Sequence, residues 1–483
     1  MKQKEKILFI TSEAVPFIKT GGLADVAGSL PAAIDSRFFD VRIILPKYAC
    51  MKDTSGLRFM ASFTIGFMGK EEYAGLYCAN VSGVTYYFID SEYYFSGEKP
   101  YGDWKWDITK FCFFEQAALA ALKAADFRPD VIHCHDWQTG LVPAYLRQFA
   151  EGDAFYRGIR TVFTIHNLKF QGSWSMDEMK AISGLPDRYF TVDGLEYYGG
   201  ANMLKGGVVY SDAVTTVSPT YAEEIKTPEY GEGLDGLMRA RSDSLRGILN
   251  GVDYREFDPA TDDLILKKYD VSSFRQRKKR NKTDILSKMG METEEDRMLA
   301  VMVSRLTDQK GLDILMEACD DLMKDGLALI VVGTGDPKYE DYFRGLSERY
   351  PGKAAFYAAY SDTVAHQAYA GADVLLMPSR FEPCGLSQLI ALRYGTLPVV
   401  RETGGLADTV EPYNRFTDQG TGFSFAGYRS DEFADTVRRA EKLYFSHRIK
   451  WNRMVERAMR KDFSWRNSAL KYQEMYNWLT GRF

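Results

Sequence analysis

The hexapeptide TGGLAD occurs twice in the chain, at 20–25 and at 403–408, and Lys19 precedes the first copy. A glycine pair that opens a helix lets backbone N–H groups approach an anion, and the helix dipole favours negative charge at that end. Lys19 would add a full positive charge beside Gly21 and Gly22. The first copy therefore suits a phosphate ligand. The alternative is an ordinary turn between a strand and a helix, with a surface lysine.

A second pair of cations follows an apolar run in the second half of the chain. The segment SRLTDQKG (304–311) places Arg305 and Lys310 after a predicted strand, where ligands of open α/β sheets bind. Arginine binds a diphosphate as a fork and lysine binds it as a point charge. The two side chains therefore suit a diphosphate, and a solvated loop is the alternative.

The segment MPSRFEPCGLSQLIALRYG (377–395) combines a predicted strand, a loop that carries Glu382, and a helix that opens near Gly385. A carboxylate on such a loop suits hydrogen bonds to sugar hydroxyls, and the start of the helix suits phosphate. In the alternative interpretation, Glu382 only stabilises the helix dipole.

Histidines and carboxamides mark two further strand ends. In HCHDWQTG (133–140), His133 and His135 would point to the same face of a strand, as a zinc site requires, but no third ligand stands at a suitable spacing. We therefore favour Asp136 as a polar group at the end of this strand. His166 and Asn167 end the next predicted strand and suit a sugar, although a purely structural histidine is the alternative.

The turn VVGTGDPKY (331–339) resembles a dinucleotide-binding loop only in part. It lacks the third glycine, and no acidic residue stands at the distance that NAD binding requires. The sequence therefore does not favour NAD.

Apolar, β-branched runs alternate with segments of helical spacing along the whole chain, as is typical of the α/β class. This alternation predicts a parallel sheet flanked by helices in each half. Helical spacing is clearest at 23–34 and 109–125. The predicted strands are 6–11, 41–46, 84–89, 131–135, 161–165 and 213–218 in the first half, and 298–306, 328–333, 354–360, 373–379 and 396–400 in the second.

The alternation pauses near residue 250 and restarts at 298, which predicts two Rossmann-like domains. The basic run RQRKKRNK (275–282) lies in the pause. We interpret it as a solvated helix face, with a phosphate or nucleic-acid patch as the alternative. Because the segments around the two TGGLAD copies do not match, we attribute the repeated hexapeptide to convergent loop chemistry, not to duplication.

Composition excludes several classes of function. The 483 residues carry a net charge of −5, with 45% hydrophobic and 26% charged residues, which is typical of a globular protein and argues against nucleic acid as a partner. The 6 cysteines have no repeated short spacing, as expected of reduced thiols. No apolar run approaches the ~20 residues of a membrane span. We expect an unprocessed cytoplasmic protein that does not bind membranes.

Taken together, the ordered motifs resemble the bacterial glycogen synthase and plant starch synthase family, from about Ile7 to Phe463. The resemblance rests on KTGGLADVAGSLP, HCHDWQTGL, FTIHNLKFQG, ILNGVD, SRLTDQKG and YAGADVLLMPSRFEPCGLSQLIALRYGTLPVVRETGGLADTV. It implies a GT-B architecture, in which two Rossmann-like domains close over a deep interdomain cleft. The expected domains are 1–248, completed by a C-terminal helix at 465–483, and 249–464.

The family transfers glucose from a nucleoside diphosphate glucose, ADP-glucose in bacteria, to the non-reducing 4-hydroxyl of an α-1,4-glucan such as glycogen, with retention. No cofactor and no metal is implied. The residues that the resemblance implies for catalysis are Arg305, Lys310, Glu382, His166 and Asp136. Those implied for substrate binding are Lys19, Gly21, Gly22, Asn167, Asn250, Tyr360, Leu386, Ser387 and Thr403.

The resemblance also implies how these residues act. Arg305 and Lys310 would neutralise the departing diphosphate, with Glu382 on the glucose hydroxyls and Tyr360 against the base. No carboxylate in the motifs is a convincing nucleophile, which favours a same-face route in which the diphosphate helps to deprotonate the acceptor. Gln138 departs from the family, where a histidine is usual, and we expect it to affect acceptor contacts.

Three alternatives remain at this point. A glucan synthase that uses UDP-glucose would share every motif, because either base could stack on Tyr360. A non-catalytic glucan-binding paralogue would be expected to lose Lys19, Arg305, Lys310 or Glu382, and all four are present. An α-glucan phosphorylase would need lysine-bound pyridoxal phosphate and a much longer chain.

Overall fold

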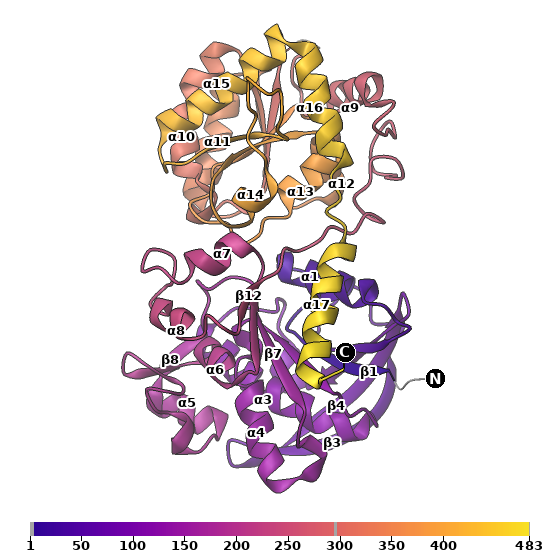
Figure 1. The fold of residues 1–483 in the computed structure, drawn as a ribbon, viewed down its shortest axis with the longest axis vertical. Coiled ribbons are helices and arrows are strands. Elements are labelled where there is room, and N and C mark those ends of the chain that lie inside the picture. The colour runs from indigo at the N-terminus through magenta and orange to yellow at the C-terminus, as the bar shows by residue number, and fades with distance from the viewer. Residues whose placement is uncertain (1–3, 294–296, 483) are drawn as a thin grey trace. The chain divides into compact units, whose positions relative to one another are not determined.

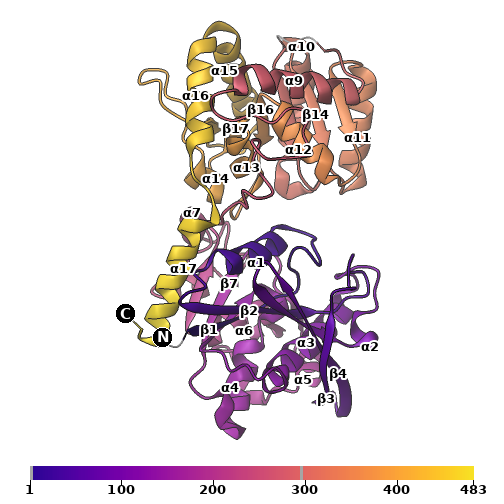
Figure 2. The same ribbon diagram turned by 90° about the vertical axis from the view of Figure 1, so that its right-hand side faces the viewer.

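The computed structural model describes residues 4–293 and 297–482, which form two compact units (Figures 1 and 2). The N-terminal unit comprises Met1–Val217, Ala222–Leu249 and Trp465–Phe483, and the C-terminal unit comprises Ser218–Tyr221 and Asn250–Ser464. The expected domain borders were 248/249 and 464/465. Residues 1–3, 294–296 and 483 of those domains lie outside the described residues.

The described residues of the N-terminal unit contain a nine-stranded sheet in the order β12-β11-β7-β6-β1-β2-β5-β4-β3. Its strands are β1 (Glu5–Ile10), β2 (Phe39–Pro46), β3 (Arg58–Phe67), β4 (Lys70–Val81), β5 (Val84–Asp90), β6 (Val131–His135), β7 (Arg160–Ile165), β11 (Ala213–Thr216) and β12 (Leu245–Gly247). All six strands predicted for this half are present, within one or two residues at their ends.

The strands from β12 to β5 run parallel, whereas at the edge β4 pairs antiparallel with both β5 and β3. This edge corrects the prediction of a purely parallel sheet. Phe67 pairs with Lys70 across a two-residue turn, Met68 and Gly69, whose φ angles are 50° and 76°. Positive φ at both turn positions is typical of the tight hairpins that join antiparallel strands. Apolar and polar residues are mixed along both strands, so neither is the continuous apolar run by which the buried parallel strands were predicted.

Helices cover the sheet of the N-terminal unit. They are α1 (Gly22–Ala33), α2 (Glu92–Phe95), α3 (Trp104–Ala124), α4 (Val142–Gly152), α5 (Met176–Ser183), α6 (Met203–Tyr210), α8 (Asp235–Ala240) and α17 (Trp465–Thr480), and α7 (Pro219–Glu224) lies at the division of the chain. A small antiparallel sheet joins β8 (Ser173–Ser175), β10 (Gly200–Asn202) and β9 (Glu196–Tyr197). The C-terminal helix α17 packs against α1 (Figure 1).

The sheet of the C-terminal unit has the order β15-β14-β13-β16-β17-β18, and its described strands are all parallel. Figure 1 shows α10, α11 and α15 on one side of this sheet and α9, α12 and α16 on the other. The strands are β13 (Leu299–Val303), β14 (Ala328–Val332), β15 (Ala354–Tyr357), β16 (Val374–Met377), β17 (Leu397–Arg401) and β18 (Phe423–Phe425). The helices are α9 (Phe274–Lys288), α10 (Leu312–Asp325), α11 (Pro337–Arg349), α12 (Asp362–Gly371), α13 (Ser387–Arg393), α14 (Gly404–Thr409), α15 (Ser430–Ser446) and α16 (Arg448–Arg460).

The basic run at 275–282 lies on α9, and only part of it is the predicted solvated face. Lys278 and Lys282 are buried, and these two positions correct the prediction. Lys278 Nζ donates to Thr396 Oγ1 at 2.7 Å and to the carbonyls of Tyr369, Ala370 and Tyr394, whereas Lys282 Nζ pairs with Asp373 at 2.7 Å. Burial lowers the pKa of Lys278 to about 7. These lysines stabilise the packing of α9 and are not available to a polyanion.

Candidate functional site

The first TGGLAD copy lies where β1 leads into α1, which begins at Gly22. A Cβ added at Gly21 would meet no heavy atom within 4 Å, so the backbone is open on that side. Lys19 Nζ lies 2.7 Å from Asp25 Oδ1 of the same copy. A phosphate at this loop would therefore share the ammonium group with Asp25.

A carboxylate that belongs to none of the sequence motifs holds this loop in place. Glu13 is buried directly after β1, and it accepts hydrogen bonds from the N–H of Thr20 at 2.5 Å and from Thr20 Oγ1 at 2.8 Å. The hydroxyl of Tyr101 donates to the same carboxylate at 3.0 Å. Burial raises the pKa of Glu13. The only sequence signal was an acidic residue between an apolar strand and the glycine loop.

Asp136 lies at the end of β6 with a φ of 58°, a backbone region that non-glycine residues rarely adopt. Its Oδ1 accepts hydrogen bonds from the N–H groups of His166 at 2.7 Å and Asn167 at 3.4 Å. Burial raises the pKa of Asp136 to about 7, although these two hydrogen bonds lower it. Asp136 therefore joins the end of β6 to the end of β7, which brings three predicted site residues together.

Three histidines form a stack behind this strand end. The rings of His133 and His135 are stacked with centroids 4.2 Å apart, so they share one face of β6 as predicted. His135 Nδ1 lies 3.0 Å from His166 Nε2, and His133 Nδ1 lies 2.8 Å from the hydroxyl of Tyr476 on α17. Burial lowers the pKa of His166 to about 3, so its ring is neutral.

In the C-terminal unit, the predicted cations lie in the segment that leads from β13 to α10. Arg305 is exposed, and it has no ion pair with any carboxylate in the described part of the chain. Lys310 Nζ lies 2.6 Å from Glu382 Oε2, and that oxygen also accepts from Ser379 Oγ at 3.1 Å. The structure therefore brings Lys310 and Glu382 together, as a cation and an anion side by side.

Glycines without room for a side chain hold this arrangement. A Cβ at Gly311 would lie 1.9 Å from the carbonyl oxygen of Pro378, and its φ is 70°. Gly404 and Gly405, from the second TGGLAD copy, pack against the loop of Glu382. A Cβ at Gly404 would lie 2.0 Å from the carbonyl oxygen of Glu382, and the N–H of Gly405 donates to that oxygen at 3.1 Å. The second copy thus positions the backbone of Glu382.

Comparisons with known proteins identify the chain at the level of the family. Residues 6–240 match the family model described as the starch synthase catalytic domain, and residues 288–461 match that of glycosyl transferases group 1. A glycogen synthase from Lachnospira eligens is 52% identical over 98% of this chain and 99% of its own length. One from Geobacillus thermodenitrificans is 47% identical over 98% of both chains.

The chain belongs to the glycogen and starch synthase family.

Solved structures agree with this assignment. The catalytic domain of starch synthase IV from Arabidopsis thaliana, bound to ADP and acarbose, aligns with a TM-score of 0.93 at 33% identity, over 99% of this chain and all of that one. A sucrose-phosphate synthase from Thermosynechococcus elongatus aligns with a TM-score of 0.64 at 18% identity, which indicates the fold alone. The chain is therefore a glycosyltransferase with the GT-B fold.

The remaining predicted residues of this family site differ in exposure. Tyr360 is 68% exposed, whereas Asn250 is 7% exposed and its buried Oδ1 lacks a hydrogen-bond partner. Leu386 and Ser387 are half-buried at the start of α13. Thr403 is fully buried. Its role in substrate binding stays a prediction.

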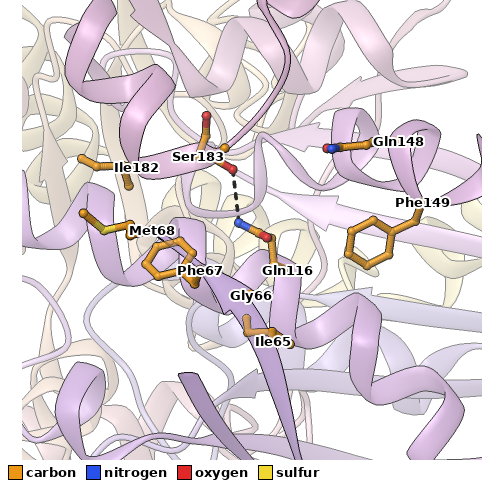
Figure 3. A pocket seen from close by; sticks show the side chains of 10 residues that line it. Ile65, Gly66, Phe67, Met68, Gln116, Gln148, Phe149, Ile182 and Ser183 are labelled. Atoms are coloured by element: carbon orange, nitrogen blue, oxygen red, sulfur yellow. Dashed lines mark hydrogen bonds between the residues drawn. The ribbon is translucent and has the colours of Figure 1, made fainter. Parts of the chain in front are cut away.

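Other features of the structure do not coincide with these residues. Figure 3 shows a cavity of about 400 Å³ in the N-terminal unit, where Gln116 donates to the carbonyl oxygen of Ser183 at 3.2 Å. No charged side chain lines it, so it does not suit a diphosphate.

Across residues 4–293 and 297–482, no group of three or more His, Cys, Asp or Glu is arranged to hold a metal ion. No helix in the same ranges has the length and apolar character needed to cross a bilayer.

Proposed function

We propose that the chain is a glycogen synthase. It transfers glucose from ADP-glucose to the non-reducing 4-hydroxyl of an α-1,4-glucan, with retention of the anomeric configuration. The similarity to bacterial glycogen synthases spans almost the full length of both chains. The Arabidopsis starch synthase structure holds ADP, which supports adenine as the base of the donor.

The observation that carries the proposal is the charge arrangement after β13. Arg305 is exposed and has no ion pair in the described part of the chain, and Lys310 lies against Glu382. A guanidinium group without a carboxylate partner is available to a diphosphate, and it binds phosphate oxygens as a fork. The exposed ring of Tyr360 belongs to the same unit and offers a face to a nucleotide base.

Transfer breaks the bond between C1 of glucose and the diphosphate oxygen, and it forms a bond between C1 and the acceptor O4. The proton of the acceptor hydroxyl passes to the departing diphosphate, on the same face of the sugar. Negative charge grows on the diphosphate as the bond breaks, so cations at Arg305 and Lys310 stabilise the transition state more than the ground state. Glu382 binds glucose hydroxyls, and its Oε2 lies 2.6 Å from Lys310 Nζ.

In the N-terminal unit, we assign Lys19, Gly21 and Gly22 to the phosphates of the donor. The open backbone at Gly21 supports this assignment. We assign Asp136, His166 and Asn167 to the glucosyl unit, because hydrogen bonds already join these three residues at adjoining strand ends. The neutral ring of His166 suits a hydroxyl and not a phosphate.

The test is a transfer assay with purified protein, glycogen and ADP-glucose, in which ADP release and glucan extension are both measured. We expect equimolar release and extension, with new α-1,4 bonds that an exo-acting amylase specific for them removes. A parallel assay with UDP-glucose separates the two donors. Release of UDP without release of ADP would show that the donor is UDP-glucose and not ADP-glucose. Release of neither nucleotide, with glycogen binding intact, would indicate a non-catalytic glucan-binding protein.

A further inference from the structure

His135 contacts His166 but belongs to the interior of the N-terminal unit. Its side chain is fully buried, and its ring is stacked on His133 and on Phe9, at centroid distances of 4.2 Å and 5.1 Å. The hydroxyl of Thr139 accepts from the backbone N–H of His135 at 2.7 Å, which also fixes the backbone. The ring therefore cannot turn to face a substrate, and any effect it has on the reaction must pass through His166.

The contact between the two rings restricts how they are protonated. His135 Nδ1 and His166 Nε2 are 3.0 Å apart, which is a hydrogen-bond distance, so one nitrogen carries a proton and the other does not. Burial lowers the pKa of His135 well below its ordinary value, and the neighbouring His133 and His166 lower it further. Both rings are therefore neutral, and each has one N–H.

The other nitrogen of His135 separates the two possible arrangements. His135 Nε2 is buried and has no hydrogen-bond partner. If His166 donated, His135 would carry its proton on Nε2, as a buried N–H without an acceptor. If His135 donates from Nδ1, its Nε2 carries no proton and is a buried acceptor without a donor. Orphaned buried N–H groups are rarer than under-satisfied acceptors, which favours His135 as the donor.

We propose that His135 is a positioning residue that donates Nδ1–H to His166 Nε2 and thereby holds His166 as the tautomer with its proton on Nδ1. His166 then presents an N–H donor, not an acceptor, at the end of β7. This N–H suits a hydroxyl oxygen of the glucosyl unit as its acceptor. The contact with the glucosyl unit rests on the proposed function, whereas the tautomer of His166 does not.

The rest of the stack explains why His135 stays in place. His133 Nε2 lies 2.6 Å from Thr164 Oγ1, and His133 Nδ1 lies 2.8 Å from the hydroxyl of Tyr476. Both nitrogens of His133 are thus satisfied by other groups, and none is left to compete for His135. Tyr476 is at the far end of the stack from His166, so it provides a matched control.

The tautomer is measured on the full-length protein without substrate. The chain has 5 histidines, so selective ¹⁵N-histidine labelling and long-range ¹H–¹⁵N correlation resolve the ring nitrogens, and single substitutions assign them. We expect a protonated Nδ1 and a bare Nε2 for His166 in the wild type. The opposite pattern would overturn the proposal without any variant.

Two substitutions test the role of His135. His135→Phe keeps the stacked ring but removes the donor, so the ¹⁵N signals of His166 should move toward a mixture of tautomers, and kcat/KM should fall about tenfold, as for the loss of one hydrogen bond. His135→Asn places an amide N–H near Nδ1 and should restore most of the wild-type signal and rate.

Tyr476→Phe should leave the His166 signals unchanged and kcat/KM within about twofold. Unchanged His166 signals in folded His135→Phe would show that His135 is only structural. Absence of any transfer by the wild type would refute the proposed function, but the nitrogen signals would still decide the tautomer. The two proposals therefore fail by different measurements.

Discussion

Lys310 Nζ lies 2.6 Å from Glu382 Oε2, and the two side chains are only 17% and 7% exposed. A pair this shielded is coupled, because removal of one charge leaves the other poorly solvated and without its partner. Lys310 therefore balances the charge of Glu382, and in the proposed mechanism it also faces the diphosphate.

This coupling predicts that Lys310→Met and Glu382→Gln are not additive. We expect each change to lower kcat/KM by about 100- to 1,000-fold, and the double variant to lose much less than the product of the two. A double-mutant cycle on kcat/KM for ADP-glucose measures the coupling. Lys338→Met is the control, since Lys338 forms an exposed pair with Asp308 and should change the rate little. Strict additivity would show that the two residues act independently.

Arg305 is exposed and has no carboxylate partner in the described residues, so we expect its charge to contribute little to folding and, under the proposed function, to bind the diphosphate. We expect Arg305→Ala to lower kcat about 100- to 1,000-fold and to leave the free energy of unfolding within about 0.5 kcal/mol of the wild type. Turnover assays and denaturant titration check both parts. Arg344→Ala removes an exposed arginine that pairs with Asp341 on α11, and it should change neither. A near-normal rate for Arg305→Ala would contradict the assignment to the diphosphate.

Asp136 predicts the pH dependence of the free enzyme. Burial raises its pKa from 3.8 to about 7, so the folded protein holds this proton more tightly than the unfolded chain. The contribution to stability therefore falls as the pH rises from about 4 to about 7, and it is constant above that range. If the carboxylate is the active form, kcat/KM rises with pH up to about 7 and then levels off.

The pKa of His166 is about 3, so this histidine does not titrate in the same range. Asp136→Asn should remove the rise of kcat/KM with pH up to about 7 and leave a low kcat/KM that does not depend on pH. Rate measurements between about pH 5 and pH 9 check this, with inactivation monitored separately at each pH. If kcat/KM of the wild type did not change with pH across this range, Asp136 would not be the group that controls activity.

The alternating elements and most of the candidate site could be predicted from the sequence, because each depends on a local pattern. Buried parallel strands are continuous apolar runs, and polar residues at their ends cluster at one edge of the sheet. Asp136, His166 and Asn167 come together for this reason. The antiparallel edge was missed, since β3 and β4 mix apolar with polar residues and are partly exposed, and since the turn at Met68 and Gly69 gives no strong signal.

Tertiary contacts account for the other differences. Lys278 and Lys282 stand in a basic run, which predicts a solvated helix face. Both are buried because backbone carbonyls and Asp373, which are distant in the sequence, surround them at α9. Glu13 also accepts from Tyr101, and His135 contacts His166, and no spacing rule indicates these partners, which lie far away in the sequence. The two TGGLAD copies are identical in sequence. A Cβ at Gly21 in the first copy would meet no atom within 4 Å, whereas Gly404 in the second copy is packed against a backbone carbonyl.

The open copy predicts that Gly21→Ala folds normally. The φ of Gly21 is −161°, an extended conformation that any residue adopts, and an added Cβ would meet no atom within 4 Å. We expect a change in the free energy of unfolding of no more than about 0.5 kcal/mol. If the donor phosphate approaches this backbone, the methyl group should raise the KM for ADP-glucose about tenfold or more. Steady-state kinetics and thermal unfolding of one preparation measure both, and an unchanged KM would place the phosphates elsewhere.

The packed copy predicts the opposite for Gly404→Ala. A Cβ there would lie 2.0 Å from the carbonyl oxygen of Glu382, and the φ of 45° is itself costly for alanine. We expect a loss of about 2–4 kcal/mol in stability together with a loss of activity, because the loop of Glu382 must move. Gly290→Ala is the matched control: its φ is 65°, but no atom lies within 4 Å, so it carries the backbone strain without the overlap. If both variants lost the same stability and kept the same rate, the contact of Gly404 with Glu382 would have no part in positioning the carboxylate.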